Sequence, residues 1–97
     1  MTWTEIINIK AYSSIEAQRI IKTFYDLMLI KEEIKPTDIT LLKNYNVIND
    51  FYIRLTWHGD IPHDGRSALG FQLVEAFSAF GFIYHFVWVR ESSLHLF

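Results

Sequence analysis

The sequence contains no cysteine, and this absence excludes several classes of site. Disulfide scaffolds, thiolate zinc sites, iron–sulfur clusters and cysteine nucleophiles all require that residue. Proline and glycine are scarce, with two and four residues respectively, so the chain has few natural breaks. No low-complexity stretch, charge block or linker divides it. With 97 residues, we expect a single domain that spans residues 1–97.

An excess of charge of one sign is also missing. The formal net charge is −2, and acidic and basic residues are mixed along the chain. Nucleic-acid-binding domains usually carry a basic patch, and the sequence has none. The phosphate-cradling glycine loop, the G-x-S-x-G elbow and the EF-hand pattern do not occur either. We therefore expect no nucleic-acid partner and no cofactor.

Long hydrophobic runs are missing as well. The first residues lack a basic segment that leads into an apolar stretch, so no signal peptide is predicted. The longest uncharged run, residues 76–89, contains Gly81 and His85 and is shorter than the roughly 20 residues that span a membrane. We expect a soluble, cytoplasmic protein without a membrane partner.

Apolar residues are abundant, and their spacing predicts the first elements. Hydrophobic residues make up 51% of the chain and aromatic residues 16%, which is typical of a folded domain. A strand is predicted over residues 3–12, because Ile7, Ile9 and Ala11 share one face and Asn8, Lys10 and Tyr12 share the other. Ser13 and Glu16 fit a capping box, in which the serine hydroxyl accepts the third backbone N–H of the helix and the glutamate reaches back. A helix should then run to about residue 31, because apolar residues recur at helical spacing.

The rest of the chain shows three strand patterns and one helix pattern. The expected elements are a strand at 39–47, a strand at 51–58, a loop at 59–65, a helix at 66–80 and a strand at 82–90, with residues 91–97 unassigned. A short helix over 37–44 is the alternative to the first of these strands. Asp64 is placed to cap the helix, and Gly81 is placed to end it in a left-handed conformation.

The order β-α-β-β-α-β predicts a ferredoxin-like α+β domain. Four antiparallel strands would carry two helices on one face, with the first and third strands in the centre. The helix at 66–80 is apolar nearly all round, and the strand at 82–90 is apolar on both faces. The sheet face without helices therefore needs a cover. We expect a homodimer through this open sheet face; the alternative is that the tail 91–97 folds back over it.

This pattern resembles the dimeric α+β barrel proteins. The similar local feature is the strand 51–57, Phe-Tyr-Ile-Arg-Leu-Thr-Trp, which ends in an aromatic residue and is followed by a polar loop and a helix. The group includes small cofactor-free monooxygenases of the antibiotic-biosynthesis type and muconolactone isomerase-like enzymes. Many of these proteins have a histidine near the second helix, whereas His58 and His63 lie in the loop itself. The resemblance therefore implies a fold and a dimer, and it transfers no catalytic role.

Histidines are the strongest candidates for catalysis. His58 and His63 lie close to Asp60 and Asp64 in the loop, where they could form an acid–base pair or contact a substrate. The spacing matches no metal motif, and the competing interpretation is a solvated loop with capping and turn residues. His85 interrupts an apolar strand, so it is either a general base that lines a pocket or a core histidine satisfied by a neighbour.

Three further residues are candidates for ligand binding. Arg54 could bind an anionic ligand, or it could pair across strands with an acid such as Glu5. Trp57 and Tyr45 could line a pocket between the sheet and the helices together with other aromatic residues, or they could form core. The aromatic residues grouped with them are Phe77, Phe80 and Trp88.

Two functions follow from these observations. The first is a homodimeric binding or structural module that holds a small apolar or aromatic ligand between sheet and helices. The alternative is a cofactor-independent monooxygenase or isomerase that acts on a small aromatic substrate, with His58, His63 or His85 as the base. Converging polar groups in one site would favour the enzyme, and scattered solvated histidines would favour the module.

Overall fold

The computed structural model describes residues 1–27 and 35–95. The elements are β1 (Thr2–Ala11), α1 (Ser14–Leu27), β2 (Asp38–Lys43), β3 (Asp50–His58), α2 (Ala68–Phe77) and β4 (Gly81–Val89). The predicted order of elements is therefore confirmed, and the alternative of a short helix over 37–44 is wrong. The prediction that the first helix continues to residue 31 lies outside the described residues beyond Leu27.

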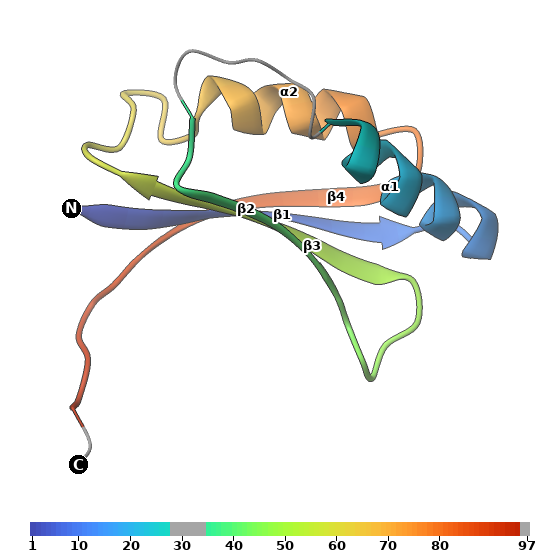
Figure 1. Cartoon of the computed structure of the whole chain (residues 1–97), viewed down its shortest axis with the longest axis horizontal. Helices are drawn as coiled ribbons and strands as arrows, with labels where there is room; N and C mark the ends of the chain where they lie inside the picture. Colours follow the sequence, from blue (N-terminus) through green and yellow to red (C-terminus); the bar gives the residue numbers. More distant parts are fainter. Residues whose placement is uncertain (28–34, 96–97) are drawn as a thin grey trace.

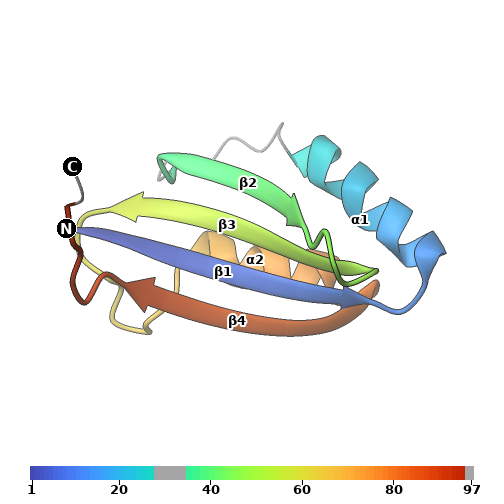
Figure 2. The ribbon, with the colours of Figure 1, turned by 90° about the horizontal axis from the view of Figure 1, so that it is seen from below.

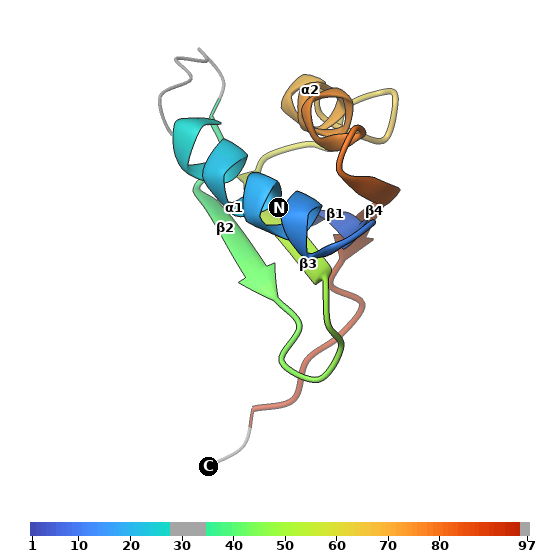
Figure 3. The same cartoon turned by 90° about the vertical axis from the view of Figure 1, so that its right-hand side faces the viewer.

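The four strands form one antiparallel sheet in the order β2-β3-β1-β4, with β1 and β3 in the centre as predicted. Both helices lie on the same face, which leaves the other face bare (Figure 1). Seen from below, the strands are not covered by any helix (Figure 2). The end-on view shows the two layers and the tail that leaves the sheet on the bare side (Figure 3). The chain thus has the predicted ferredoxin-like α+β architecture.

The core lies between the sheet and the helices. Alternate residues of β1 and β3 point into it because strand side chains alternate between faces. Glu5 lies among these residues with no exposed surface. The buried hydrophobic residues are Trp3, Ile7, Ile9, Ala17, Ile20, Phe51, Ile53, Leu55, Trp57, Leu69, Leu73 and Phe77.

The start of α1 differs in detail from the predicted capping box. The Ser13 hydroxyl accepts the backbone N–H of Ile15 at 3.2 Å, the second N–H of the helix, where the third was expected. The Glu16 carboxylate bonds to the Ser13 hydroxyl, where contact with backbone was expected. This bond lowers the pKa of Glu16. Serine and glutamate therefore still act together at the helix start.

The start and end of α2 correct two predictions. Ser67, not Asp64, is the N-cap: its hydroxyl accepts the backbone N–H of Gly70 at 2.8 Å. The helix ends at Phe77, and Gly81 begins β4 without a positive φ. A tertiary contact of Ser67, described below, explains why the helix begins later than its apolar pattern indicates.

Strand β2 is shorter than predicted. Its ladder ends at Lys43, and Asn44 starts a turn in which its side-chain oxygen accepts the backbone N–H groups of Asn46 and Val47 at 2.9 and 3.1 Å. Asn49 closes the turn with a φ of 63°, a conformation that asparagine tolerates. Tyr45 is therefore 99% exposed in a turn instead of lying on a strand.

The bare sheet face, called the open face below, is rich in exposed aromatic side chains. The tail does not cover it, since residues 90–95 are exposed throughout, and the prediction that the tail folds back is wrong for these residues. Neither α1 nor α2 is long and apolar enough to cross a membrane, and the described residues contain no other helix. The large exposed hydrophobic residues on the open face are Leu42, Tyr52, Phe82, Tyr84, Phe86 and Trp88.

Candidate functional site

The buried carboxylate of Glu5 is the centre of the most concentrated polar cluster among the described residues. Trp57 Nε1 donates to Glu5 Oε1 at 3.0 Å, and the Ser67 hydroxyl donates to the same oxygen at 2.6 Å. The other oxygen, Oε2, accepts the Ser67 backbone N–H at 3.2 Å and lies 2.6 Å from His85 Nε2. A buried acid is rare unless its oxygens are hydrogen-bonded, and here both oxygens are.

The cluster draws on four segments that are distant in the sequence. Glu5 comes from β1 and Trp57 from the neighbouring central strand β3. His85 comes from β4, on the other side of β1, where it pairs with Ile7. Ser67 is the N-cap of α2, so the positive end of the helix dipole faces the carboxylate. Sheet and helix therefore converge on one anion.

Gly70 makes this close approach of α2 possible. A Cβ at this position would overlap Glu5 Oε2 and would lie 2.9 Å from His85 Nε2. Any side chain larger than hydrogen would therefore push the helix, the carboxylate or the imidazole out of place.

The geometry of His85 suits it to accept a proton. When Glu5 is ionised it can only accept hydrogen bonds, so the contact with His85 then requires a proton on Nε2 and leaves the lone pair of a neutral ring on Nδ1. The side chain keeps 10% of its accessible surface, and Nδ1 is not among the buried unpaired atoms of the described residues. The ring of Phe71 meets the imidazole edge to face, with 5.7 Å between the centroids. An imidazole oriented by a buried carboxylate is the arrangement of a general base.

Two of the residues predicted from the sequence belong to this cluster. His85 is at its accessible side, and Trp57 is one of the donors to Glu5. The Trp57 ring also stacks on Trp3, with centroids 5.6 Å apart and an interplanar angle of 16°. An aromatic wall therefore borders the polar cluster.

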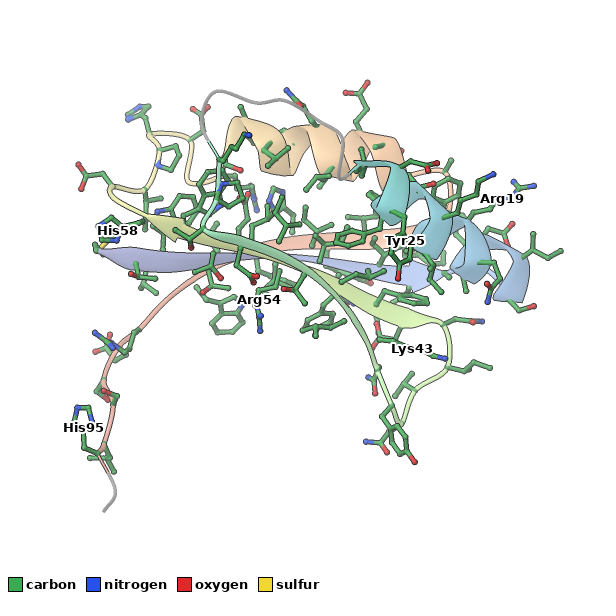
Figure 4. The ribbon with its side chains drawn as sticks, viewed as in Figure 1. Arg19, Tyr25, Lys43, Arg54, His58 and His95 are labelled. Carbon is green, nitrogen blue, oxygen red and sulfur yellow. The ribbon has the colours of Figure 1, made fainter. Side chains whose placement is uncertain are left out.

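Arg54 lies elsewhere, and the expected pairing with Glu5 is wrong. Its side chain extends from β3 on the side away from the helices (Figure 4), whereas Glu5 faces the core. Arg54 Nη2 instead contacts Asp38 Oδ2 at 3.2 Å and Thr40 Oγ1 at 3.4 Å on β2. Bonds from Thr40 and Arg54 lower the pKa of the exposed Asp38.

The other candidates are not brought together. His58 lies at the end of β3, His63 is in the loop that follows, and both are exposed (Figure 4 labels His58). Tyr45 is in the turn after β2, and Trp88 is on the open face, away from the predicted pocket. No group of three or more potential metal ligands occurs within residues 1–27 and 35–95.

The sequence named Glu5 only as a possible partner of Arg54, and it did not indicate Ser67 or Gly70 as site residues. One signal could have identified Glu5: it has the same parity as Trp3 and Ile7, so strand alternation alone assigns it to the buried face. Ser67 and Gly70 carry no such signal, because their roles depend on how close α2 lies to the sheet.

A second polar cluster on the open face is structural. The Asn8 amide donates to Asp50 Oδ1 at 2.8 Å and to the Phe51 carbonyl at 2.9 Å. The Asn44 amide donates to Asp50 Oδ2 at 3.0 Å, and Lys10 Nζ lies 3.9 Å from Oδ1. Burial raises the pKa of Asp50, but these partners outweigh burial and lower it overall. The cluster ties the β2–β3 turn to β1.

Comparisons with known proteins identify the fold. No protein-family model and no curated protein sequence matches the chain. A point mutant of SnoaB, described as a cofactor-independent oxygenase from Streptomyces nogalater, aligns with a TM-score of 0.60 at 13% identity over 96% of each chain. The chain has the fold of SnoaB. The unaltered SnoaB structure gives a TM-score of 0.59 with the same identity and coverage. The fold that the sequence resemblance implied is thus confirmed.

Proposed function

We propose that the protein is a homodimeric, cofactor-independent oxygenase for a small aromatic substrate, with His85 as its general base. The observation that carries the proposal is the 2.6 Å contact between His85 Nε2 and the buried Glu5 carboxylate. This contact fixes the orientation of the imidazole with its Nδ1 lone pair free, and it stabilises the imidazolium that forms when Nδ1 takes a proton. Glu5 acts through His85 and is a positioning residue.

The chemistry needs no cofactor if the substrate itself supplies the electrons. His85 Nδ1 removes a proton from a CH2 group that is acidified by an aromatic ketone, which leaves a carbanion. The carbanion passes one electron to O2, and the two radicals combine to form the C–O bond of a peroxide. The imidazolium returns its proton to give the hydroperoxide, which loses water to leave a carbonyl. In total, CH2 and O2 become C=O and H2O.

The surroundings of His85 support an aromatic substrate. Phe71 lies against the imidazole, and the stacked pair of Trp3 and Trp57 borders Glu5 on the other side. Aromatic walls with a few polar groups are typical of sites for flat ligands. The fold shared with SnoaB adds support by analogy only, because one fold serves many functions.

A homodimer is supported by the open face. Its exposed aromatic row on β4 is of the kind that monomers seldom leave uncovered. Hollows of about 500 and 270 Å³ open on this face and can receive side chains of a second copy. They are lined by Met1, Thr2, Thr4, Trp88, Val89 and Arg90, and by Leu42, Lys43, Asn44 and Tyr52.

A second function, a binding module without chemistry, is favoured by the complete hydrogen bonding of Glu5. The same bonds from Ser67 and Trp57 that orient the carboxylate also fasten α2 to the sheet. On this interpretation, His85 is one more donor to a structural anion. The two functions differ in whether replacing His85 affects turnover.

The test uses anthrone, an aromatic ketone with an acidic CH2 group, and follows O2 uptake together with the formation of anthraquinone. We expect a rate above that of the uncatalysed reaction and, under 18O2, one labelled oxygen in the product. His85→Ala should lower the rate about 10²- to 10⁴-fold, the usual contribution of a general base. His63→Ala is the matched control, because His63 is exposed in a loop and should leave the rate unchanged.

Two results would contradict the oxygenase. One is a wild-type rate equal to the uncatalysed rate while circular dichroism shows a folded protein. The other is an unchanged rate in folded His85→Ala. If anthrone or anthraquinone still binds in either case, the binding module is the better account.

A further inference from the structure

Trp3 contains a buried donor that the proposed chemistry does not use. The residue is 3% exposed, and its indole Nε1 has no hydrogen-bond partner in the described part of the chain. Buried tryptophan N–H groups usually find a partner, and leaving one unpaired costs about 1–3 kcal/mol. An unpaired donor of this kind in an otherwise well-bonded core needs an explanation.

Trp3 is continuous with the candidate site. It lies on the same face of β1 as Glu5, two residues before it. Its ring stacks on Trp57, and the Nε1 atom of Trp57 donates to Glu5, which in turn contacts His85. The two tryptophans thus have similar rings in similar places but different partners: the Trp57 donor is satisfied by the protein, and the Trp3 donor is not.

The loop between β3 and α2 starts next to Trp3: Trp3 pairs with Trp57, and the backbone N–H of Gly59 donates to the Met1 carbonyl at 2.7 Å. This loop rises over the end of the sheet where β1 begins, on the helix side (Figure 1). Gly59 and Gly65 bracket it at φ values of 108° and 78°, and open space surrounds the position of a Cβ at each. Between them, Ile61 packs against the core. This loop is therefore the segment from whose side an acceptor atom would approach Trp3 Nε1.

We infer that Trp3 Nε1 binds a carbonyl oxygen of the aromatic ligand, and so selects ligands with a carbonyl over plain aromatic hydrocarbons. The inference rests on the proposed function for the identity of the ligand as an aromatic ketone. A carbonyl oxygen is a neutral acceptor, which fits a donor buried in an apolar wall better than a carboxylate would. The bound carbonyl gives the Trp3 N–H the acceptor that it lacks in the free protein. The new hydrogen bond therefore adds to the affinity for the ligand.

A matched pair of probes tests this assignment. Anthraquinone-2-sulfonate and anthracene-2-sulfonate share a three-ring frame and a solubilising sulfonate, and they differ in the two carbonyl oxygens. The chain has three tryptophans, so a 1H–15N spectrum contains three indole N–H signals. They are assigned by the single variants W3F, W57F and W88F.

We expect anthraquinone-2-sulfonate to move the Trp3 indole signal downfield, as a new hydrogen bond does, and the anthracene probe to leave it without that shift. The quinone should also bind about 5- to 10-fold more tightly than the anthracene, in line with one hydrogen bond to a buried donor. W3F should remove this preference. W88F, which also loses an indole, should retain it, because Trp88 is exposed on the open face, away from the core.

The failures of the two proposals can be distinguished. If the quinone shifts the His85 imidazole signals but not the Trp3 indole, the site stands and the role of Trp3 is wrong. If both probes bind equally in the wild type, an internal water satisfies Trp3 and the inference is overturned. If neither probe at millimolar concentration moves the His85 signals or any indole signal, both proposals fall. The wild-type spectrum decides these outcomes even if W3F does not fold.

Discussion

His85 and Glu5 lie 80 residues apart in the chain, yet His85 Nε2 is 2.6 Å from Glu5 Oε2 inside the domain. The contact spans the first and last strands of the sheet, which are neighbours because β4 pairs antiparallel with β1. Trp57 and Ser67 complete the bonding of the same carboxylate. The Glu5 side chain thus links three strands to the start of α2. Mutation of Glu5 tests how much these hydrogen bonds stabilise the fold.

Replacing Glu5 by Gln should destabilise the fold by about 2–4 kcal/mol, because the amide NH2 would face donors that now bond to a carboxylate oxygen. Urea unfolding measures the change. Glu75→Gln is the matched control, since Glu75 lies exposed on α2 and should change stability by less than about 0.5 kcal/mol. Equal free energies of unfolding for the two variants would show that the Glu5 hydrogen bonds do not stabilise the fold.

Gly70→Ala should also destabilise the protein, against the helix propensity of alanine. Alanine favours a helix by about 1 kcal/mol over glycine, but its Cβ would overlap Glu5 Oε2, and overpacking costs about 1–3 kcal/mol. Shortening the acid should relieve the overlap, so the double variant Glu5→Asp/Gly70→Ala should lose less stability than the sum of the single variants. Ala76→Gly, on an exposed position of α2, calibrates the propensity. A stabilised Gly70→Ala would mean that α2 lies farther from the sheet.

Asp50 should make stability fall in acid. Its folded pKa is below 3.8 because the bonds from Asn44 and Asn8 and the Lys10 charge outweigh the effect of burial. A lowered folded pKa stabilises the protein above the unfolded value, and this stabilisation is lost as the pH falls through 3.8 toward the folded pKa. Asp50→Asn should therefore cost about 1–3 kcal/mol near pH 6, and the gap to wild type should narrow below about pH 4.

Urea titrations between pH 2.5 and 6 measure that gap. Asp60→Asn controls for the loss of one carboxylate in an exposed loop. A gap for Asp50→Asn that stays constant across the whole range would contradict the assignment of the acid-sensitive stabilisation to Asp50.

Phe86→Glu should dissociate the proposed dimer. Phe86 stands in the aromatic row of the open face, and a carboxylate there would have to be desolvated in the interface. Sedimentation velocity at micromolar concentrations should show a dimer for the wild type and a monomer for the variant. Tyr25→Glu is the control, because Tyr25 is also an exposed aromatic residue but lies on α1, on the other side of the sheet (Figure 4). A wild-type monomer at these concentrations would refute the dimer.

The strands and their faces could be predicted because alternation is a local property of the chain. Each of the four strand patterns lies within a few residues of the strand that forms. The end of β2 and the start of α2 differ from the prediction, because side-chain hydrogen bonds there override the hydrophobic pattern. Asn44 ends β2 early by bonding to the turn, and Ser67 starts α2 late by capping it while bonding to Glu5.

By itself, the sequence determined the element order, the fold class and the excess of apolar surface on the open face, since these follow from the period of the hydrophobic pattern. Only the tertiary structure decided the site. No motif in the sequence marks Glu5 as a site residue. Its role follows from the position of β1 between β3 and β4 in the sheet. Long-range pairing brings Trp57 and His85 to the same carboxylate, and the hydrogen atom of Gly70 leaves room for α2 to close over it. Contacts between residues so far apart have no local pattern from which they can be predicted.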